Sequence, residues 1–486
     1  MNSVKKNYIF NVIYQLLVIL FPLITMPYVS RVIGTNGIGI YSYTHSIAHY
    51  FVIFSMLGIN NYGNRSIAKC RNNNSDLSRT FFEIYSIQFI MTLLSVIFYF
   101  IFVVVNDEYS KIFIVQFIYL FSCFFDINWL YFGLEKFKFT TILNILIKTI
   151  IIIFLFLFVK NEDDLIIYTI IMTLSVLVSY LILWVPLRKF ISFKMFKTIK
   201  INKVFNLHFV SCLKLFIPVI AVSIYKYMDK IMLGIMTNMN NVALYENAEK
   251  VVSIPICLIT ALGTVMLPKI ANISKENENY KLDNIIEKTM KFSMFLSFPI
   301  TFGVAAIGNM FAPIFFGNDF IESGNIIVFL SITNIFISWA SVIRMQYLIP
   351  TEKDNIYIIS VLFGAIFNFT FNYIFIKFIG LYGAILSTIF AEFIVMSIQT
   401  FMVRKELNIK KYVFNCIPFF IKALIMYIFI KSLEYYLISL NINRILILLI
   451  IVSLGIIIYS VFNLNYILDN IKSMFKEGDF YGKKKC

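Results

Sequence analysis

The stretch from Thr140 to Val159 reads TTILNILIKTIIIIFLFLFV, and its last ten residues are all apolar. A run of about 20 mostly apolar residues is long enough to cross the roughly 30 Å hydrocarbon core of a bilayer as a helix. It lacks the strict alternation of polar and apolar residues that is typical of a membrane-spanning strand. Because a helix satisfies its own backbone hydrogen bonds, the stretch predicts a membrane-spanning α-helix.

Stretches of the same kind recur along the whole chain. Of its 486 residues, 60% are hydrophobic and 14% are charged, whereas soluble domains have about 45–50% and about 25%. We predict fourteen spans, with approximate limits 8–30, 38–60, 80–105, 111–132, 140–159, 165–187, 208–235, 243–266, 290–312, 324–348, 356–377, 382–403, 413–433 and 443–464. The connections between them leave no room for a soluble domain. We therefore expect an all-α, polytopic membrane protein.

Lys and Arg residues are distributed unevenly between these spans. If the N-terminus is cytoplasmic, 29 of the 42 fall in cytoplasmic connections and tails. Six fall on the outer side, namely Arg31, Lys111, Lys160, Lys377, Lys431 and Arg444. This bias follows the positive-inside rule and predicts that both termini are cytoplasmic. The net charge of +16 therefore indicates orientation in a membrane rather than a surface for nucleic acid.

The two halves of the chain share a weak internal repeat. Gly34 and Tyr41 in the first two spans have counterparts in Gly234 and Tyr245. Six spans per repeat give a parallel repeat, and such transporters carry their substrate between the halves. The repeat predicts an N-terminal lobe (1–187), a basic cytoplasmic linker (188–207), a C-terminal lobe (208–403), and a segment with two extra spans and a tail (404–486). Chance similarity between apolar segments is the alternative explanation.

Charged residues within the spans form a second signal. Each costs about 2.5–3.5 kcal/mol on insertion scales, so each should face protein or water. Lys226, Asp229 and Lys230 are three or four residues apart and share one helix face. One interpretation is ion pairing between neighbouring spans. The other is a hydrated, partly cationic cavity suited to a phosphate-bearing substrate, because these cations outnumber the acids near them: Lys214, Lys226, Lys230 and Arg344.

Other polar positions carry weaker signals. His45 and His49 are four residues apart, but the sequence offers no third ligand, so polar lining of a pore is favoured over a metal site. Arg31 precedes Gly34 at the end of the first span, where helix capping or headgroup contact is at least as reasonable as ligand contact. No Ser-His-Asp set, zinc motif or phosphate-binding loop occurs in the sequence. We predict a protein that is not an enzyme and has no cofactor or metal.

Short motifs follow one another along nearly the whole chain. They are Pro27 to Gly34 with Gly39 to Tyr41; Leu57 to Gly63 with Arg65; Trp129 with Phe132 to Phe137; Asp229 to Gly234; Tyr245 to Ala248; Leu262 to Pro268; Gln346 with Leu348 to Pro350; and Gly380 with Gly383, Ala384 and Glu392. In this order and spacing the chain resembles the polysaccharide repeat-unit flippases of the multidrug/oligosaccharidyl-lipid/polysaccharide exporter superfamily.

The resemblance implies a fold and a function. The fold is a bundle of fourteen helices in two six-helix lobes around a central cavity, with two extra C-terminal helices. The function is to move an undecaprenyl-diphosphate-linked oligosaccharide to the outer leaflet of the bacterial plasma membrane, for O-antigen, capsule or a related polysaccharide. Transport would be coupled to a Na⁺ or H⁺ gradient. Polysaccharide polymerase machinery and membrane lipids would be partners, and nucleic acid would not.

Charge and motif position together give candidate site residues. For the diphosphate the candidates are Lys230 and Arg344, followed by Lys214, Lys226 and Arg31. For cation coupling the candidates are Asp229, Glu246, Glu249 and Glu392. Four of these fall on motif positions: Asp229, Lys230, Glu246 and Glu392. By contrast, Lys214, Lys226 and Arg344 rest on the charge argument alone.

Two other functions are compatible with a chain of this kind. A multidrug/cation antiporter of the same superfamily would favour an acidic cavity and about twelve spans, so the cations within the spans and the last two spans argue against it. A polysaccharide polymerase or glycosyltransferase would favour a large external loop, whereas the outer connections here reach only about ten residues.

Overall fold

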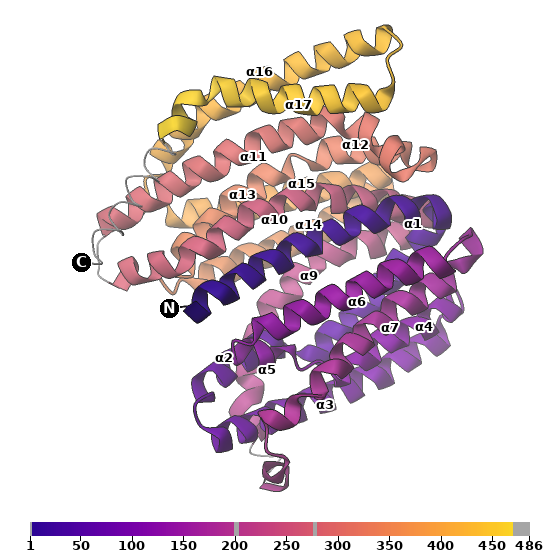
Figure 1. Cartoon of the computed structure of the whole chain (residues 1–486), viewed down its shortest axis with the longest axis vertical. Helices are drawn as coiled ribbons and strands as arrows, with labels where there is room; N and C mark the ends of the chain where they lie inside the picture. Colours follow the sequence, from indigo (N-terminus) through magenta and orange to yellow (C-terminus); the bar gives the residue numbers. More distant parts are fainter. Residues whose placement is uncertain (1, 199–203, 276–278, 470–486) are drawn as a thin grey trace. The chain divides into compact units, whose positions relative to one another are not determined.

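The computed structural model of the chain describes residues 2–198, 204–275 and 279–469 (Figure 1). Within these ranges the secondary structure is helical throughout, with no strand. The predicted all-α fold is confirmed. Residues 199–203 of the predicted linker and the basic tail from residue 470 lie outside the described residues.

Residues 1–247 and 361–391 form one compact unit, called unit 1 below. Its helices are α1 (Asn2–Met56), α2 (Ile59–Cys70), α3 (Asn74–Val105), α4 (Ser110–Phe121), α5 (Asn128–Gly133), α6 (Phe137–Phe158), α7 (Leu165–Trp184) and α9 (Val210–Met236). A π-helix, η5 (Phe205–Phe209), leads directly into α9. Unit 1 also contains the start of α10 (Met239–Lys275), most of α14 (Asp354–Ile379) and the first half of α15 (Leu381–Val403).

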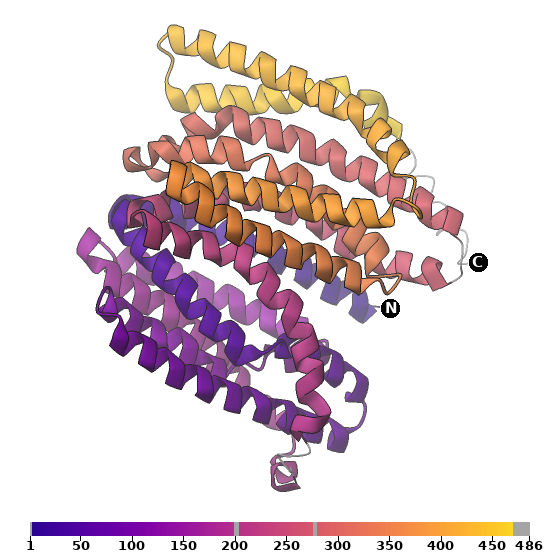
Figure 2. The same cartoon turned by 180° about the vertical axis from the view of Figure 1, so that it is seen from behind.

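Residues 248–360 and 392–486 form the second compact unit, unit 2. Its helices are α11 (Asn279–Phe316), α12 (Ile321–Leu330), α13 (Thr333–Ile343), the π-helix η7 (Arg344–Leu348), α16 (Ile409–Ser439) and α17 (Arg444–Phe462). The last two lie side by side in both views and pack against α11 (Figures 1 and 2). Buried methionines such as Met290 and Met294 fill the core beneath them.

The apolar surface of these helices faces outward. Val104 of α3, Phe414 of α16 and Phe378 of α14 are each at least 75% exposed, which is the pattern expected where lipid is the solvent. Ten helices of the described part are long and apolar enough to cross a membrane, and the α12–α13 pair, bent by 44°, makes an eleventh crossing if it is one span. The chain is a multi-pass membrane protein.

The remaining predicted spans fall on α1 and α10, whose side chains are only partly within the described residues. Span 8–30 and most of span 38–60 fall on α1, which ends at Met56 and is broken at Gly34, where φ is 72° and ψ is 179°. A positive φ of this kind favours glycine, which has no Cβ. Span 243–266 is part of α10.

Close helix contacts hold α9 and the start of α10 against α1. A Cβ on Gly39 would lie 1.8 Å from the carbonyl oxygen of Met239. A Cβ on Gly58 would lie 2.8 Å from the backbone of α9 at Cys212. Small residues let helix backbones approach closely where lipid gives no hydrophobic driving force for association. The predicted division into lobes at 188–207 and 404 remains a prediction.

Candidate functional site

A buried carboxylate lies at the centre of a polar cluster in unit 1. Asp229 of α9 is 1% exposed. Its Oδ2 accepts hydrogen bonds from the Tyr245 hydroxyl of α10 at 2.7 Å and the Thr388 hydroxyl of α15 at 2.6 Å. Its Oδ1 accepts one from the Asn372 amide of α14. Asn372 also donates to Asn368 at 3.2 Å, so four helices supply the cluster.

Next to this carboxylate, Lys230 forms an ion pair with Glu246 of α10. Both side chains are nearly buried, with 7% and 11% of their surface exposed. The Lys230 ammonium also lies 5.2 Å from the centroid of the Tyr227 ring, within the range of a cation–π interaction. A buried ion pair is costly to break from one side, because the remaining charge stays in a poorly solvating environment.

Aromatic rings extend the site toward α1 and α4. The Tyr227 ring lies 4.2 Å from the ring of His49, and His49 Nδ1 is hydrogen-bonded to the Tyr119 hydroxyl at 2.7 Å. His45 stacks on Tyr119 at 4.8 Å and lies 3.5 Å from Gln116 Oε1. Both histidines therefore contact aromatic partners, and His45 also lies beside an amide. Among the residues described, no three His, Cys, Asp or Glu side chains gather as a metal site would require.

The predicted site residues separate into two sets. Lys226, Asp229, Lys230 and Glu246 lie together in unit 1, with Lys226 exposed and 5.7 Å from the Tyr227 ring. Lys214 and Arg31 also belong to unit 1, and their side chains are exposed.

Arg344, Glu249 and Glu392 belong to unit 2. All three side chains are half-buried. The Arg344 guanidinium lies 5.3 Å from the ring of Tyr357, and its Nε atom is buried without a hydrogen-bond partner among the described residues. The roles of all these residues remain predictions.

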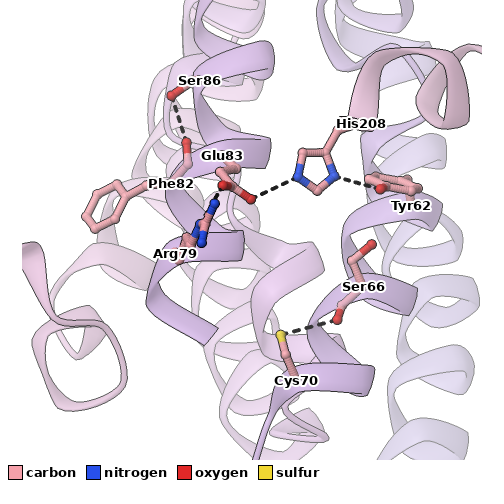
Figure 3. A network of polar contacts seen from close by, with 8 residues as sticks. All are labelled: Tyr62, Ser66, Cys70, Arg79, Phe82, Glu83, Ser86 and His208. Atoms are coloured by element: carbon pink, nitrogen blue, oxygen red, sulfur yellow. Dashed lines mark hydrogen bonds and ion pairs between the residues drawn. The ribbon is translucent and has the colours of Figure 1, made fainter. Parts of the chain in front are cut away.

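The residue pattern missed a second buried network in unit 1. His208 of η5 lies between Glu83 of α3 and Tyr62 of α2 (Figure 3). Glu83 lies within the predicted span 80–105, and its sequence position indicates no partner. The only sequence signal was a lone His beside the basic linker, and its partners are more than 120 residues away.

Another charge within a span, Asp126, has a structural role. Its Oδ1 accepts from the backbone N–H of Asn128 at 3.0 Å and from the Asn128 amide at 2.8 Å. These bonds satisfy donors at the start of α5, as a helix cap does. The adjoining core residue Trp129 donates to Gln88 at 3.0 Å.

Unit 2 contains two larger cavities. One, of about 530 Å³, is almost wholly apolar and lies between α10, α11, α16 and α17, with Pro299, Ile307 and Ile430 in its wall. The other, of about 970 Å³, lies where α15 ends and α16 begins, with Trp339, Arg404 and Lys410 in its wall.

Comparison with known proteins places the chain in a family. The family described as "Polysaccharide biosynthesis protein" matches residues 4–274, more than half of the chain. A Shigella dysenteriae protein named "Putative O-antigen transporter" is 22% identical over 384 residues, covering 78% of this chain and 94% of that protein. "Lipid II flippase MurJ" of Bacillus subtilis is 28% identical over 189 residues, covering 35% of this chain and 33% of that protein.

A solved structure of "Lipid II flippase MurJ, inward closed conformation" has the same fold. Its TM-score is 0.71 over 96% of this chain and 99% of that one, at 18% identity. The relatives are named for transport rather than catalysis, which supports the prediction that the chain is not an enzyme. The chain therefore belongs to the polysaccharide biosynthesis protein family, as its resemblance to the polysaccharide flippases of the multidrug/oligosaccharidyl-lipid/polysaccharide exporter superfamily predicted.

Proposed function

We propose that this protein moves undecaprenyl-diphosphate-linked oligosaccharide repeat units from the cytoplasmic to the outer leaflet by alternating access. The observation that carries the proposal is the buried set of Asp229, Lys230 and Glu246 within apolar helices. Charges placed there are expensive and typically mark a transport route. Kinship with the O-antigen transporter and the lipid II flippase supports a lipid-linked glycan as the cargo.

The ion pair suggests how a diphosphate is taken up. Lys230 already has Glu246 as its partner, so a substrate phosphate must replace that carboxylate. The exchange keeps the ammonium compensated in both states and avoids the cost of an unpaired buried charge. Arg344 is a separate candidate for phosphate binding, because a guanidinium can bind phosphate oxygens in a bidentate manner.

Cation coupling enters the proposal at two buried carboxylates, those of Glu246, which the phosphate releases from Lys230, and of Asp229. Oxygen ligands of the kind gathered around Asp229, from Tyr245, Thr388, Asn368 and the carboxylate itself, suit a hard cation such as Na⁺. A proton on Asp229 would serve the same purpose. Glu246, Glu249 and Glu392 are the further acidic candidates. Binding a cation at these acids would offset the negative charge left when Lys230 turns to the substrate.

The lipid tail needs an apolar path. The apolar cavity between α11, α16 and α17 offers one, and α16 and α17 are the helices that distinguish the chain from a twelve-span antiporter. We place the protein in the bacterial plasma membrane with both termini cytoplasmic, as the positive-inside rule predicts. Polymerase machinery on the outer side would consume the translocated repeat units.

Reconstitution tests the function directly. Purified protein in proteoliposomes is expected to expose a defined undecaprenyl-diphosphate-linked oligosaccharide to an external glycan-modifying enzyme, faster when a Na⁺ or H⁺ gradient is imposed. The same vesicles are assayed for export of cationic dyes, which a multidrug/cation antiporter would carry. Dye export without lipid-linked sugar translocation would reject the flippase function.

A further inference from the structure

His208 is a buried imidazole held between an acid and a phenol. Its Nε2 lies 3.0 Å from Oε2 of Glu83, and its Nδ1 lies 2.7 Å from the hydroxyl of Tyr62 (Figure 3). The His208 and Glu83 side chains are 8% and 10% exposed. Both ring nitrogens are therefore engaged, each by a residue from a different helix.

The acid in this network has a second cationic neighbour. Oε1 of Glu83 accepts a hydrogen bond from Nε of Arg79 at 2.9 Å. Arg79 is 64% exposed, so the second partner of the buried carboxylate reaches the surface of the protein. The other titratable group close to the Tyr62 hydroxyl is the Cys212 thiol, on the first turn of α9.

The network lies at the start of α9. It ties η5, a π-helix, to α2 and α3, and π-helical turns occur frequently at functional positions. One turn later, the backbone of α9 contacts Gly58 at the break between α1 and α2. Pro218 then interrupts the hydrogen bonding of α9 before Asp229 is reached.

We propose that Glu83, His208 and Tyr62 form a proton-binding site that clamps the start of α9 to α2 and α3, with the protonated imidazole as the clamped form. A neutral imidazole donates one hydrogen bond and accepts the other. An imidazolium donates both, and its bond to the Glu83 carboxylate then joins two opposite charges, whereas a neutral imidazole leaves the charge on the acceptor alone. Lower pH therefore tightens the clamp. The clamp does not depend on the identity of the transported substrate.

Hydrogen–deuterium exchange of the purified full-length protein in nanodiscs measures the clamp. Histidine ordinarily changes charge between pH 5 and 8. After correction for the intrinsic exchange rate, peptides covering residues 204–216 are expected to be about tenfold better protected at pH 5.5 than at pH 8. The variant His208→Gln can still donate to Glu83 and accept from Tyr62, but it cannot titrate, so its protection is expected to be independent of pH.

Three further variants separate the clamp from a purely structural contact. Glu83→Gln removes the charge partner and is expected to abolish the pH response, which keeps the test valid if His208→Gln fails to fold. Tyr62→Phe is expected to lower protection but keep the response. His45→Gln, a half-buried histidine outside the network, is expected to leave the response intact. A wild-type pH response in His208→Gln, or its loss in Tyr62→Phe or His45→Gln, would overturn the proposal.

Discussion

At the scale of single residues, Asp229 is the position where charge itself matters most. The variant Asp229→Asn keeps the size of the side chain and some of its hydrogen bonds to Tyr245, Thr388 and Asn372. It removes the negative charge that a coupling cation needs. We expect at least a tenfold loss of gradient-driven translocation and a loss of Na⁺ or H⁺ dependence, measured in proteoliposomes at equal protein content.

The matched control for this prediction is Asp319→Asn, which changes an exposed acid of unit 2. It should translocate normally. If Asp229→Asn retains full ion dependence, Asp229 is not the coupling group. Glu249 and Glu392 would then be the next candidates for cation coupling.

The Lys230–Glu246 pair makes a prediction about stability. Replacing one partner, in Lys230→Met or Glu246→Leu, breaks the ion pair while the other charge stays buried, which typically costs about 3–5 kcal/mol. Replacing both removes the two charges together, so we expect the double variant to recover most of the lost unfolding temperature in detergent. Translocation should be lost in both single variants and in the double variant. A double variant less stable than either single variant would contradict a buried pair.

At the scale of elements, the contact between α1 and α10 depends on Gly39. In Gly39→Ala the added Cβ would overlap the carbonyl oxygen of Met239, and overpacking of this kind costs about 1–3 kcal/mol or more. We expect a clearly lower unfolding temperature. Gly303→Ala in α11 is the control, because a Cβ there meets nothing within 4 Å. Equal stability of both variants would show that α1 and α10 can separate freely.

The start of α7 makes a prediction about pH. The Asp164 carboxylate accepts from the backbone N–H groups of Lys160 and Asn161 at 2.7 and 2.9 Å, and these bonds lower the pKa of Asp164 below its ordinary value. Stabilisation by a lowered acid pKa is present above the unfolded-state value of about 4 and is lost as pH falls through the folded-state value. Asp164→Ala should therefore speed hydrogen exchange of residues 160–168 at pH 7.

The effect of Asp164→Ala should fade as the pH falls below about 4, where the carboxyl is protonated in the unfolded chain and then in the folded protein. Asp163→Ala, at the neighbouring exposed acid, is the control and should change exchange little at either pH. A pH-independent effect of Asp164→Ala would mean that the charge of Asp164 does not hold the turn at residues 160–164.

At the scale of the whole molecule, the orientation in the membrane can be measured. In a variant without native cysteines, Lys405→Cys lies in a connection predicted to be cytoplasmic and Asp163→Cys in one predicted to be outside. Both positions are exposed. An impermeant maleimide added to intact cells should label only Asp163→Cys. After permeabilisation it should label both variants. Labelling of Lys405→Cys in intact cells would show that the orientation is opposite to the predicted one.

The path of the chain through the membrane could be predicted from the sequence because spans are local. A run of apolar residues needs only its own backbone to satisfy its hydrogen bonds. The predicted limits 140–159 and 382–403 accordingly agree with α6 (Phe137–Phe158) and α15 (Leu381–Val403) within a few residues. The bend between α12 and α13 was not predicted, because no Pro or Gly marks residues 325–348 of the predicted span, while its helix is interrupted at residues 331–332.

The candidate site was predicted only in part. The shared helix face of Lys226, Asp229 and Lys230 follows from helical spacing, but spacing does not say what each residue contacts. In the structure Lys226 is exposed, whereas Asp229 and Lys230 are buried and turn to different partners. The partners of Asp229 at Asn372 and Thr388 come from residues more than 140 positions away, and no periodicity encodes them.

The sequence by itself determined that this chain is a helical membrane protein of a transport family, because lipid solvation acts on local apolar runs and motifs are local too. Only the tertiary structure decided which charges are compensated. It paired Lys230 with Glu246, surrounded Asp229 with neutral donors, and placed His208 between Glu83 and Tyr62. In a medium of low dielectric constant the energy of a charge depends on partners within a few ångströms, and only packing brings those partners together.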